Sequence, residues 1–181
     1  HYDDFGNIVN NLRVQSISLA MEDVLSLKHR SLSTLSFAVN YYFGGESVLG
    51  YHLVNIGLHL LNGFLAFCLL QKIIRMLHPT EESAQILIPF FAALFFLVHP
   101  VQTIGVTYIV QRNGELAAFF YLLSLHSFLY AEEKNGLHKF TGYLLFLTTY
   151  GFALFSKQDA ISIPLMAMLL YGILFFRNYR D

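Results

Sequence analysis

The chain has 181 residues, of which 55% are hydrophobic and 13% are charged, and its formal net charge is −1. Soluble domains carry about 25% charged residues, so this composition excludes an ordinary soluble domain and indicates a membrane protein. The near-zero charge excludes a basic surface for nucleic acid, and the single cysteine, Cys68, excludes an intrachain disulfide or a zinc-type cysteine cluster.

Residues 1–47 are predicted to form a non-cytoplasmic first loop that does not span the membrane. They open with the acidic stretch HYDDFGNIVNN, in which Asp3 and Asp4 are adjacent. Apolar residues then recur at helical spacing, which predicts one or two amphipathic helices lying in the membrane interface. These residues are Leu19, Val24, Leu27, Leu32 and Leu35. The glycines at 44 and 45 are expected to end this pattern before the first span.

Five apolar blocks follow, and we expect residues 48–181 to fold as an all-α, polytopic membrane helical bundle. The blocks cover 48–70, 84–98, 116–130, 140–155 and 160–176. A bilayer core of about 30 Å needs about 20 helical residues, so several blocks need flanking residues to complete a span. About five spanning helices are predicted, although the short 84–98 block also fits a re-entrant or buried segment.

Basic residues follow every second block, and this alternation predicts the orientation of the bundle. Lysine and arginine favour the cytoplasmic side of a membrane. The sites are Lys72 with Arg75, Lys134 with Lys139, and Arg177 with Arg180. The acidic stretch, residues 99–103 and residues 156–159 then face the other side, which is the periplasm in a bacterium or the lumen of the endoplasmic reticulum in a eukaryote.

The paired aspartates, Asp3 and Asp4, have two interpretations. Aspartates in loops most often cap a turn or a helix. At a membrane surface they can also act as a general base on an acceptor hydroxyl, or hold a divalent cation. Their residue type alone leaves both interpretations open, and it leaves the cofactor undefined.

Four polar residues lie in the first apolar block, and they are His52, Asn55, His59 and Asn62. Their spacing places them on one face of a helix, where polar groups contact a neighbouring helix or a wet cavity. Hydrogen bonding between helices is the preferred interpretation for Asn62, whereas His52 lies nearer the outer end. A metal site would need a third ligand beside the two histidines of this block, and His99 is a possible one. The spacing is not specific, so no metal site is predicted.

Two basic residues on the same predicted side are candidates for binding a lipid phosphate. Arg112 precedes Glu115 by three residues, so it can form an ion pair on one helix or hold a phosphate with its guanidinium. Lys157, in the turn SKQD, fits a snorkelling anchor or a second phosphate contact. A polar cavity is expected beside them, and its predicted lining residues are Arg30, His52, Asn55, His99, Gln102 and Glu115.

Several stretches, in order along nearly the whole chain, resemble motifs of the GT-C class of membrane glycosyltransferases. They are YDDFGNIVNN, RSLSTLSFAVNYYFGG with GYHLVNIGLHLLN, FFAALFFLVHPVQTIGVTYIVQRNGELAAFFYLLSLHSFLY and LFSKQDAISIPLMAMLLY. The similarity is to the transmembrane and tetratricopeptide-repeat O-mannosyltransferase-like family and its bacterial counterparts. It implies a partial chain, with further spans on both sides and a soluble repeat domain after them.

The resemblance also implies roles for individual residues. In GT-C enzymes an acidic residue of the first outward loop is the usual catalytic base or metal-associated group, and this position corresponds to Asp3 or Asp4. The implied donor is a polyprenyl-phosphate sugar held by basic residues, and Arg112 and Lys157 match the family's arginine and lysine. The implied acceptor is a protein or a glycan.

Two departures from the family pattern bear on activity. Ile104 stands where the family often has Glu, and Gln158 replaces the Glu of S-K-E, with Asp159 one place later. The leading hypothesis is an inverting glycosyltransferase, or a fragment of one, that acts at the non-cytoplasmic face among membrane lipids. The alternative is a non-catalytic integral membrane subunit packed against other membrane subunits. Transport is the least supported reading, because no repeat pair is evident.

Overall fold

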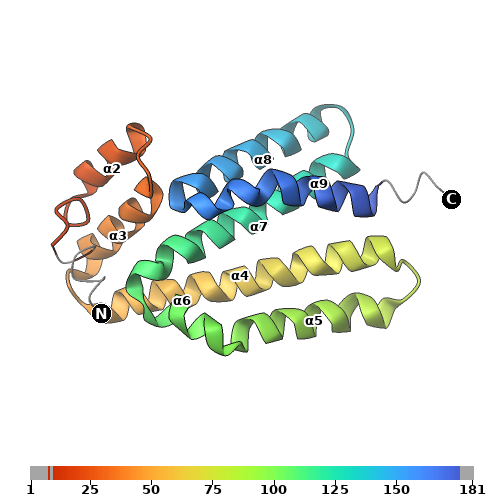
Figure 1. Cartoon of the computed structure of the whole chain (residues 1–181), viewed down its shortest axis with the longest axis horizontal. Helices are drawn as coiled ribbons and strands as arrows, with labels where there is room; N and C mark the ends of the chain where they lie inside the picture. Colours follow the sequence, from red (N-terminus) through yellow and green to blue (C-terminus); the bar gives the residue numbers. More distant parts are fainter. Residues whose placement is uncertain (1–7, 9, 176–181) are drawn as a thin grey trace.

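The computed structural model describes residue 8 and residues 10–175, and this part of the chain is helical without any β-strand (Figure 1). The predicted all-α class is therefore confirmed. The α-helices are α2 (Ile17–Leu25), α3 (Ser31–Gly44), α4 (Val48–Leu77), α5 (Glu82–Val98), α6 (Thr103–Thr107), α7 (Arg112–Glu133), α8 (Gly136–Ser156) and α9 (Ile163–Leu174). Short 3-10 segments join some of them, and these are η2 (Pro100–Gln102), η3 (Ile109–Gln111) and η4 (Gln158–Ser162).

Each predicted apolar block lies mainly in helical structure, but the helix ends differ from the block ends. Helix α4 continues to Leu77. Helix α7 begins at Arg112, so Arg112 and Glu115 both belong to α7. The last block is divided, because η4 precedes α9 and Pro164 lies in the first turn of that helix. Proline is tolerated there because the first backbone N–H groups of a helix have no partner within it.

The prediction of about five membrane spans is not confirmed. Among the described residues, α4, with 30 residues, is long and apolar enough to cross a bilayer. Helix α5 and residues 100–107 meet the same test as a pair, although they are bent by 49°. Helices α7 and α8 have 22 and 21 residues, but polar side chains along them lower their hydropathy. The described part of the chain therefore contains one helix that can span a membrane, or two spans if α5 and residues 100–107 together form a single span.

The long helices form two neighbouring pairs, α4 with α5 and α7 with α8, and α4 also packs along α7 (Figure 1). A buried cluster joins α4, α7 and α9, and its members are Leu69, Leu125, Leu129, Ala167, Leu170 and Leu174. Helices α7 and α8 approach closely at Gly142, where an added Cβ would lie 2.8 Å from the Cα of Ala131. Glycine is therefore needed at this position for the observed helix separation.

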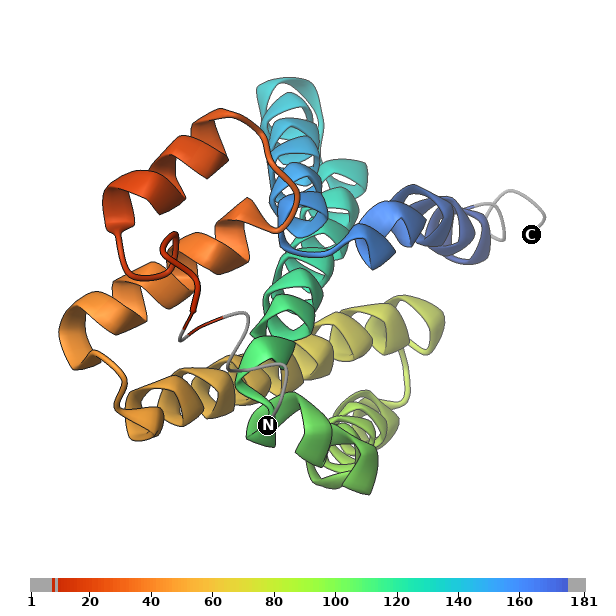
Figure 2. The same cartoon turned by 60° about the vertical axis from the view of Figure 1, so that its left-hand side comes forward.

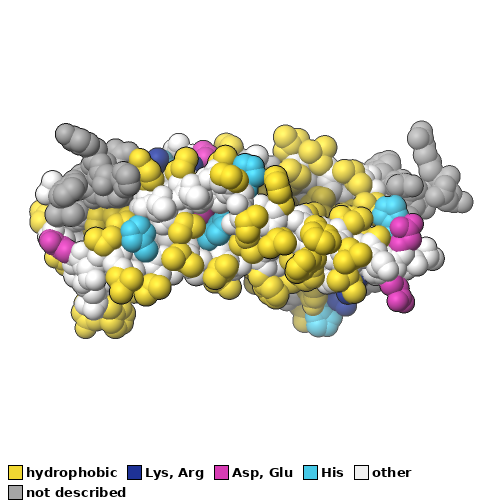
Figure 3. All heavy atoms as spheres, turned by 90° about the horizontal axis from the view of Figure 1, so that it is seen from below, with side chains coloured by type: hydrophobic (Ala, Val, Ile, Leu, Met, Phe, Trp, Pro, Cys, Tyr) yellow, Lys and Arg dark blue, Asp and Glu magenta, His cyan; other side chains and the backbone are white. Residues whose placement is uncertain are grey.

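Hydrophobic side chains cover much of the outer surface of the bundle. Figure 3 shows them along the length of one face of the molecule. On α5, for example, the side chains of Phe91 and Phe95 are 61% and 66% exposed. Soluble monomers rarely expose apolar patches this extensive, so the surface is suited to contact with lipid or with other membrane helices.

Helices α2 and α3 lie across one end of the long helices (Figures 1 and 2). Helix α3 ends at Gly44, and Gly45 follows with a φ of 55°, so the predicted break at the two glycines is confirmed. The Ser33 hydroxyl donates to the carbonyl of Ser156 at 3.3 Å, which joins α3 to the end of α8. The location of these helices in a membrane interface stays a prediction.

Candidate functional site

Arg112, the first residue of α7, is completely buried and donates five hydrogen bonds within the chain. Its Nε donates to Asn55 Oδ1 at 2.8 Å, and its Nη2 donates to Asn40 Oδ1 at 2.9 Å and to the Tyr51 carbonyl at 3.0 Å. Its Nη1 donates to the Ser36 carbonyl and to Ser36 Oγ, both at 3.3 Å. A guanidinium has five N–H groups, so these bonds satisfy its full donor capacity.

Two aromatic rings complete the surroundings of this guanidinium. Its central carbon lies 4.6 Å from the ring centroid of Phe37 and 5.5 Å from that of Tyr51, which permits cation–π attraction. None of the ion pairs among the described residues includes Arg112. We call the surrounding residues the Arg112 cage, and they are Ser36, Phe37, Asn40, Tyr51 and Asn55.

The cage also contacts the chain near its start. Ile8 is buried in a cluster whose other buried members are Val14, Phe37, Tyr51 and Ile109. Two of these, Phe37 and Tyr51, are the rings beside the guanidinium. The predicted catalytic residues Asp3 and Asp4 lie outside the described residues, so their position stays a prediction. Of the stretch that follows them, the described Ile8 shares a buried cluster with two residues of the Arg112 cage.

The polar stripe of α4 makes hydrogen bonds to the segments that precede and begin α7. His52 Nδ1 lies 3.2 Å from the Val106 carbonyl. Asn55 Nδ2 donates to the carbonyls of Tyr108 at 3.2 Å and Ile109 at 3.3 Å. The stripe therefore serves interhelical hydrogen bonding, one of the two interpretations offered by its spacing.

The ion pair that the spacing of Arg112 and Glu115 permits is not formed. Glu115 Oε2 instead accepts from Asn62 Nδ2 at 2.8 Å, and the same amide nitrogen donates to the Glu115 carbonyl at 3.0 Å. Glu115 Oε1 lies 3.6 Å from His59 Nδ1. Arg112 and Glu115 therefore both contact α4, and each contacts different residues of that helix.

Lys157 and Arg30 are more accessible cations at the same end of the bundle. Lys157 follows α8, its side chain is 31% exposed, and its Nζ lies 3.0 Å from Asp159 Oδ2. Arg30 precedes α3 with a φ of 57°, and it is exposed. The bond between Ser33 and Ser156 brings the start of α3 beside the end of α8, so both cations border this junction.

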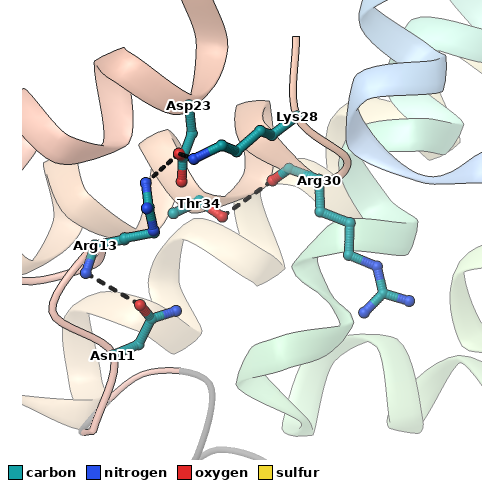
Figure 4. A network of polar contacts seen from close by, with 6 residues as sticks. All are labelled: Asn11, Arg13, Asp23, Lys28, Arg30 and Thr34. Carbon is teal, nitrogen blue, oxygen red and sulfur yellow. Dashed lines mark hydrogen bonds and ion pairs between the residues drawn. The ribbon is translucent and has the colours of Figure 1, made fainter. Parts of the chain in front are cut away.

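The segment before α3 is held by a separate polar network (Figure 4). Asp23, which is 5% exposed, pairs with Arg13 and accepts from Lys28 Nζ at 2.7 Å. The Arg30 side chain points away from this network, and its carbonyl accepts from Thr34 Oγ1 at 3.1 Å. Arg30 therefore takes no part in the ion pairs that hold α2 in place.

The remaining predicted lining residues lie near the bend after α5. His99 Nδ1 accepts from the Val101 backbone N–H at 3.2 Å, so its side chain caps η2. Gln102 ends η2, and its Oε1 lies 3.9 Å from where a Cβ on Gly105 would be. Within the described part of the chain, no three or more His, Cys, Asp or Glu side chains lie close enough together to hold a metal ion.

A hollow of about 610 Å³ lies between α3, α4 and α7. Its wall is mainly apolar, and Leu35, Leu53 and Leu116 represent the three helices. Ser36 and Asn40 also line it, and both bind Arg112. Sequence reasoning missed these two cage residues, because nothing in the spacing of α3 indicates a partner more than 70 residues away.

An all-helical chain with this lipid-compatible surface fits the class of helical membrane proteins, and comparison with known proteins agrees. The chain is 31% identical to Protein O-mannosyl-transferase TMTC4 of Homo sapiens over 184 residues, which covers 90% of this chain and 25% of that protein. It is 33% identical to Protein O-mannosyl-transferase Tmtc1 of Drosophila melanogaster over 145 residues, covering 80% of this chain and 15% of that protein.

A shorter match reaches 39% identity, over 97 residues of Protein O-mannosyl-transferase TMTC2 of Homo sapiens, with 54% of this chain and 10% of that protein covered. No family model matches the chain, and no solved structure gives a significant match. The relationship to the transmembrane and tetratricopeptide-repeat O-mannosyltransferase-like family is confirmed. The chain spans about a quarter of the length of TMTC4.

Proposed function

We propose that this chain is part of a glycosyltransferase that transfers a sugar, in the manner of a protein O-mannosyltransferase, from a polyprenyl-phosphate donor. The observation that carries the proposal is the 31% identity to TMTC4 over 90% of the chain. The acceptor is a protein hydroxyl group, and the reaction takes place at the non-cytoplasmic face of the membrane. In a eukaryotic cell this face is the lumen of the endoplasmic reticulum.

In this proposal the carboxylate of Asp3 or Asp4 removes the proton from the acceptor hydroxyl. The acceptor oxygen then forms a bond to C1 of the sugar while the bond from C1 to the phosphate oxygen breaks. The polyprenyl phosphate leaves with that electron pair, and cations near it stabilise the negative charge. A single displacement inverts the configuration at C1.

The packing of Ile8 supports this assignment of the acidic stretch. Asp4 precedes Ile8 by four residues, and a fully extended chain of that length reaches at most about 14 Å. Ile8 belongs to the same buried cluster as the two rings that flank Arg112. A location of the paired carboxylates near this end of the bundle is part of the proposal, and the burial of Ile8 supports it.

The two predicted phosphate ligands differ in availability. Lys157 has a partly exposed side chain, and its printed ion-pair partner Asp159 is exposed, so an anionic headgroup can compete for it. Direct binding by Arg112 stays a prediction, because it requires one of the five cage bonds to open. We add Arg30, which is exposed and borders the same junction as Lys157, as a further phosphate contact.

The test is sugar transfer by the full-length protein in proteoliposomes with a dolichyl-phosphate mannose donor. Replacement of both acids in the Asp3→Asn/Asp4→Asn variant is expected to reduce the turnover at least a hundredfold, because the general base is lost. Glu22→Gln, which removes an exposed carboxylate from the same region, is the matched control and is expected to keep native turnover. Native turnover in the double variant would refute the catalytic assignment.

A second candidate is a non-catalytic membrane subunit, and the residues at two motif positions favour it. Ile104 is 53% exposed and supplies no carboxylate, while Asp159 is paired with Lys157. On this hypothesis the full-length protein transfers no sugar and copurifies with other membrane proteins in fixed stoichiometry. The same assay separates the two candidates, because only the first predicts transfer that depends on the paired aspartates.

A further inference from the structure

The wall of the hollow between α3, α4 and α7 contains two polar side chains that the proposed reaction does not yet use. Ser36 and Asn40 line this hollow of about 610 Å³, and they lie one helical turn apart on α3. Both also accept from the buried guanidinium of Arg112, so each connects the cation to the hollow. No charged side chain of the described residues lines the hollow, so an anion that enters it meets no repelling carboxylate in the wall.

Each of these two side chains keeps a donor that the cage does not use. Arg112 can donate but cannot accept, so the Asn40 atom that faces it at 2.9 Å is the oxygen Oδ1. The N–H groups on Asn40 Nδ2 have no hydrogen-bond acceptor in the described part of the chain. The same holds for the hydroxyl proton of Ser36, whose Oγ accepts from Arg112 Nη1 at 3.3 Å.

Gly50 of α4 leaves the Asn40 amide accessible from the hollow, which Gly50 also lines. A Cβ added to Gly50 would lie 3.0 Å from Asn40 Nδ2, which is tighter than nine in ten Cβ contacts. The absence of a side chain at this position therefore keeps space beside the amide N–H groups, and an atom of a ligand can occupy it.

The guanidinium strengthens both of the remaining donors. When a hydroxyl or amide oxygen accepts from a cation, its own O–H or N–H becomes more positive, because hydrogen bonds in a chain polarise one another. No ion pair in the described part of the chain includes Arg112, so no carboxylate there cancels its charge. Ser36 and Asn40 therefore present this positive charge to the hollow while all five bonds of the cage stay closed.

We infer that Ser36 and Asn40 bind the anionic head of a polyprenyl phosphate, and that Arg112 acts on it through them rather than by direct contact. The other side chains of the wall are apolar, as Leu53 and Leu116 illustrate, so they suit the isoprenoid chain. A ligand with one phosphate and a long apolar chain therefore matches both parts of the wall. The inference rests on the proposed function, which supplies this class of ligand.

The test measures binding of dolichyl phosphate, which carries no sugar, to the full-length protein in lipid nanodiscs. Asn40→Asp keeps an oxygen acceptor for Arg112 but replaces the N–H groups with negative charge. It is expected to keep the native stability and to weaken binding at least about tenfold. Asn135→Asp, the same change before α8 at the opposite end of the bundle, is the control and should keep native affinity. Native affinity in a folded Asn40→Asp protein would overturn the inference.

Two further variants test the same contacts with the Asn40 bond to Arg112 intact. Gly50→Ala places a Cβ beside Asn40 Nδ2, so it is expected to weaken binding about fivefold or more. Gly57→Ala on the same helix meets nothing within 4 Å and should keep native affinity. Ser36→Ala removes the hydroxyl donor, and its carbonyl still binds Arg112, so binding should weaken without unfolding. Native affinity in both Gly50→Ala and Ser36→Ala would contradict a ligand at this position.

Two other ligands separate the phosphate contact from the apolar one. Dolichol, which lacks the phosphate, should bind at least about tenfold more weakly than dolichyl phosphate, and equally to the native protein and Asn40→Asp. Inorganic phosphate at the same concentration should not displace dolichyl phosphate, because it lacks the chain. Equal binding of dolichol and dolichyl phosphate would refute the anion site. If the variants lose binding as expected but the native protein transfers no sugar, the proposed function fails while the lipid-phosphate site stands.

Discussion

The Nε of Arg112 donates to Asn55 Oδ1 at 2.8 Å, so the first residue of α7 is bound to the polar stripe of α4. Asn55 is itself completely buried and uses its amide nitrogen for the carbonyls of Tyr108 and Ile109. One asparagine side chain therefore receives a charged donor and satisfies two carbonyls of the segment that leads into α7. The residue that the motif suggested as a phosphate ligand is a centre of intramolecular bonding in this structure.

Replacing Arg112 should strongly destabilise the protein. Gln cannot fill the cage and Lys supplies at most three donors, so both leave buried acceptors unpaired. We expect Arg112→Gln and Arg112→Lys each to cost about 1–3 kcal/mol for every buried acceptor left unpaired, measured as denaturant unfolding in detergent or nanodiscs. Arg75→Gln, at an exposed position in the last turn of α4, is the control and should change stability little. A fully stable Arg112→Lys protein would show that charge alone suffices.

Gly142→Ala should weaken the packing of α7 against α8. The new Cβ would lie 2.8 Å from the Cα of Ala131, and a backbone atom cannot move aside as a flexible side chain can. Overpacking of this kind typically costs about 1–3 kcal/mol. Gly151→Ala on the same helix meets nothing within 4 Å and serves as the matched control in thermal unfolding. Equal melting temperatures for the two variants would contradict the close approach.

Asp23→Asn should loosen α2 and the segment before it. The carboxylate is buried, and it pairs with Arg13 and Lys28, whose side chains are 43% and 47% exposed. Because these partners are partly solvated, the expected loss is modest, at about 1 kcal/mol. Faster tryptic cleavage after Arg13 and Lys28 would report it, and Glu22→Gln, at the exposed neighbouring position, should cleave at the native rate.

Lys157 provides a test of the phosphate-binding role. If it contacts the donor phosphate, Lys157→Gln should raise the KM for the lipid-linked donor about fivefold, while Asp159→Asn, which frees the lysine, should lower it. Lys139→Gln makes the same change of charge at the end predicted to be cytoplasmic, and it should leave the KM unchanged. An unchanged KM in Lys157→Gln would remove this residue from the donor site.

The positions of the helices could be predicted because apolar blocks alternate with polar or glycine-containing segments. The break at Gly44 and Gly45 was predicted for this reason, and so was the shared face of the α4 stripe. The apolar block at 116–130 is shorter than α7, which already begins at Arg112, a residue that is polar but entirely buried. A composition rule assigns such a residue to a loop, whereas the tertiary structure supplies it with partners.

Partners distant in sequence could not be predicted. Ser36 and Asn40 look like ordinary polar residues of an amphipathic helix, and only the folded arrangement of α3 reveals that both accept from Arg112. The acidic pair is a different case, since its role is inferred from motif similarity and lies outside the described residues. The predicted count of about five spans is not confirmed, because block length alone does not account for polar residues within α7 and α8.

The wide sequence separation within the Arg112 cage has a consequence for biogenesis. Asn55, Asn40 and Ser36 precede Arg112 by 57, 72 and 76 residues, so the acceptors are synthesised well before their donor. During translation α3 and α4 therefore leave the ribosome before the guanidinium that binds these groups has been synthesised. The bonds from Arg112 to α3 can form only after α7 has emerged, which makes them a late event in folding.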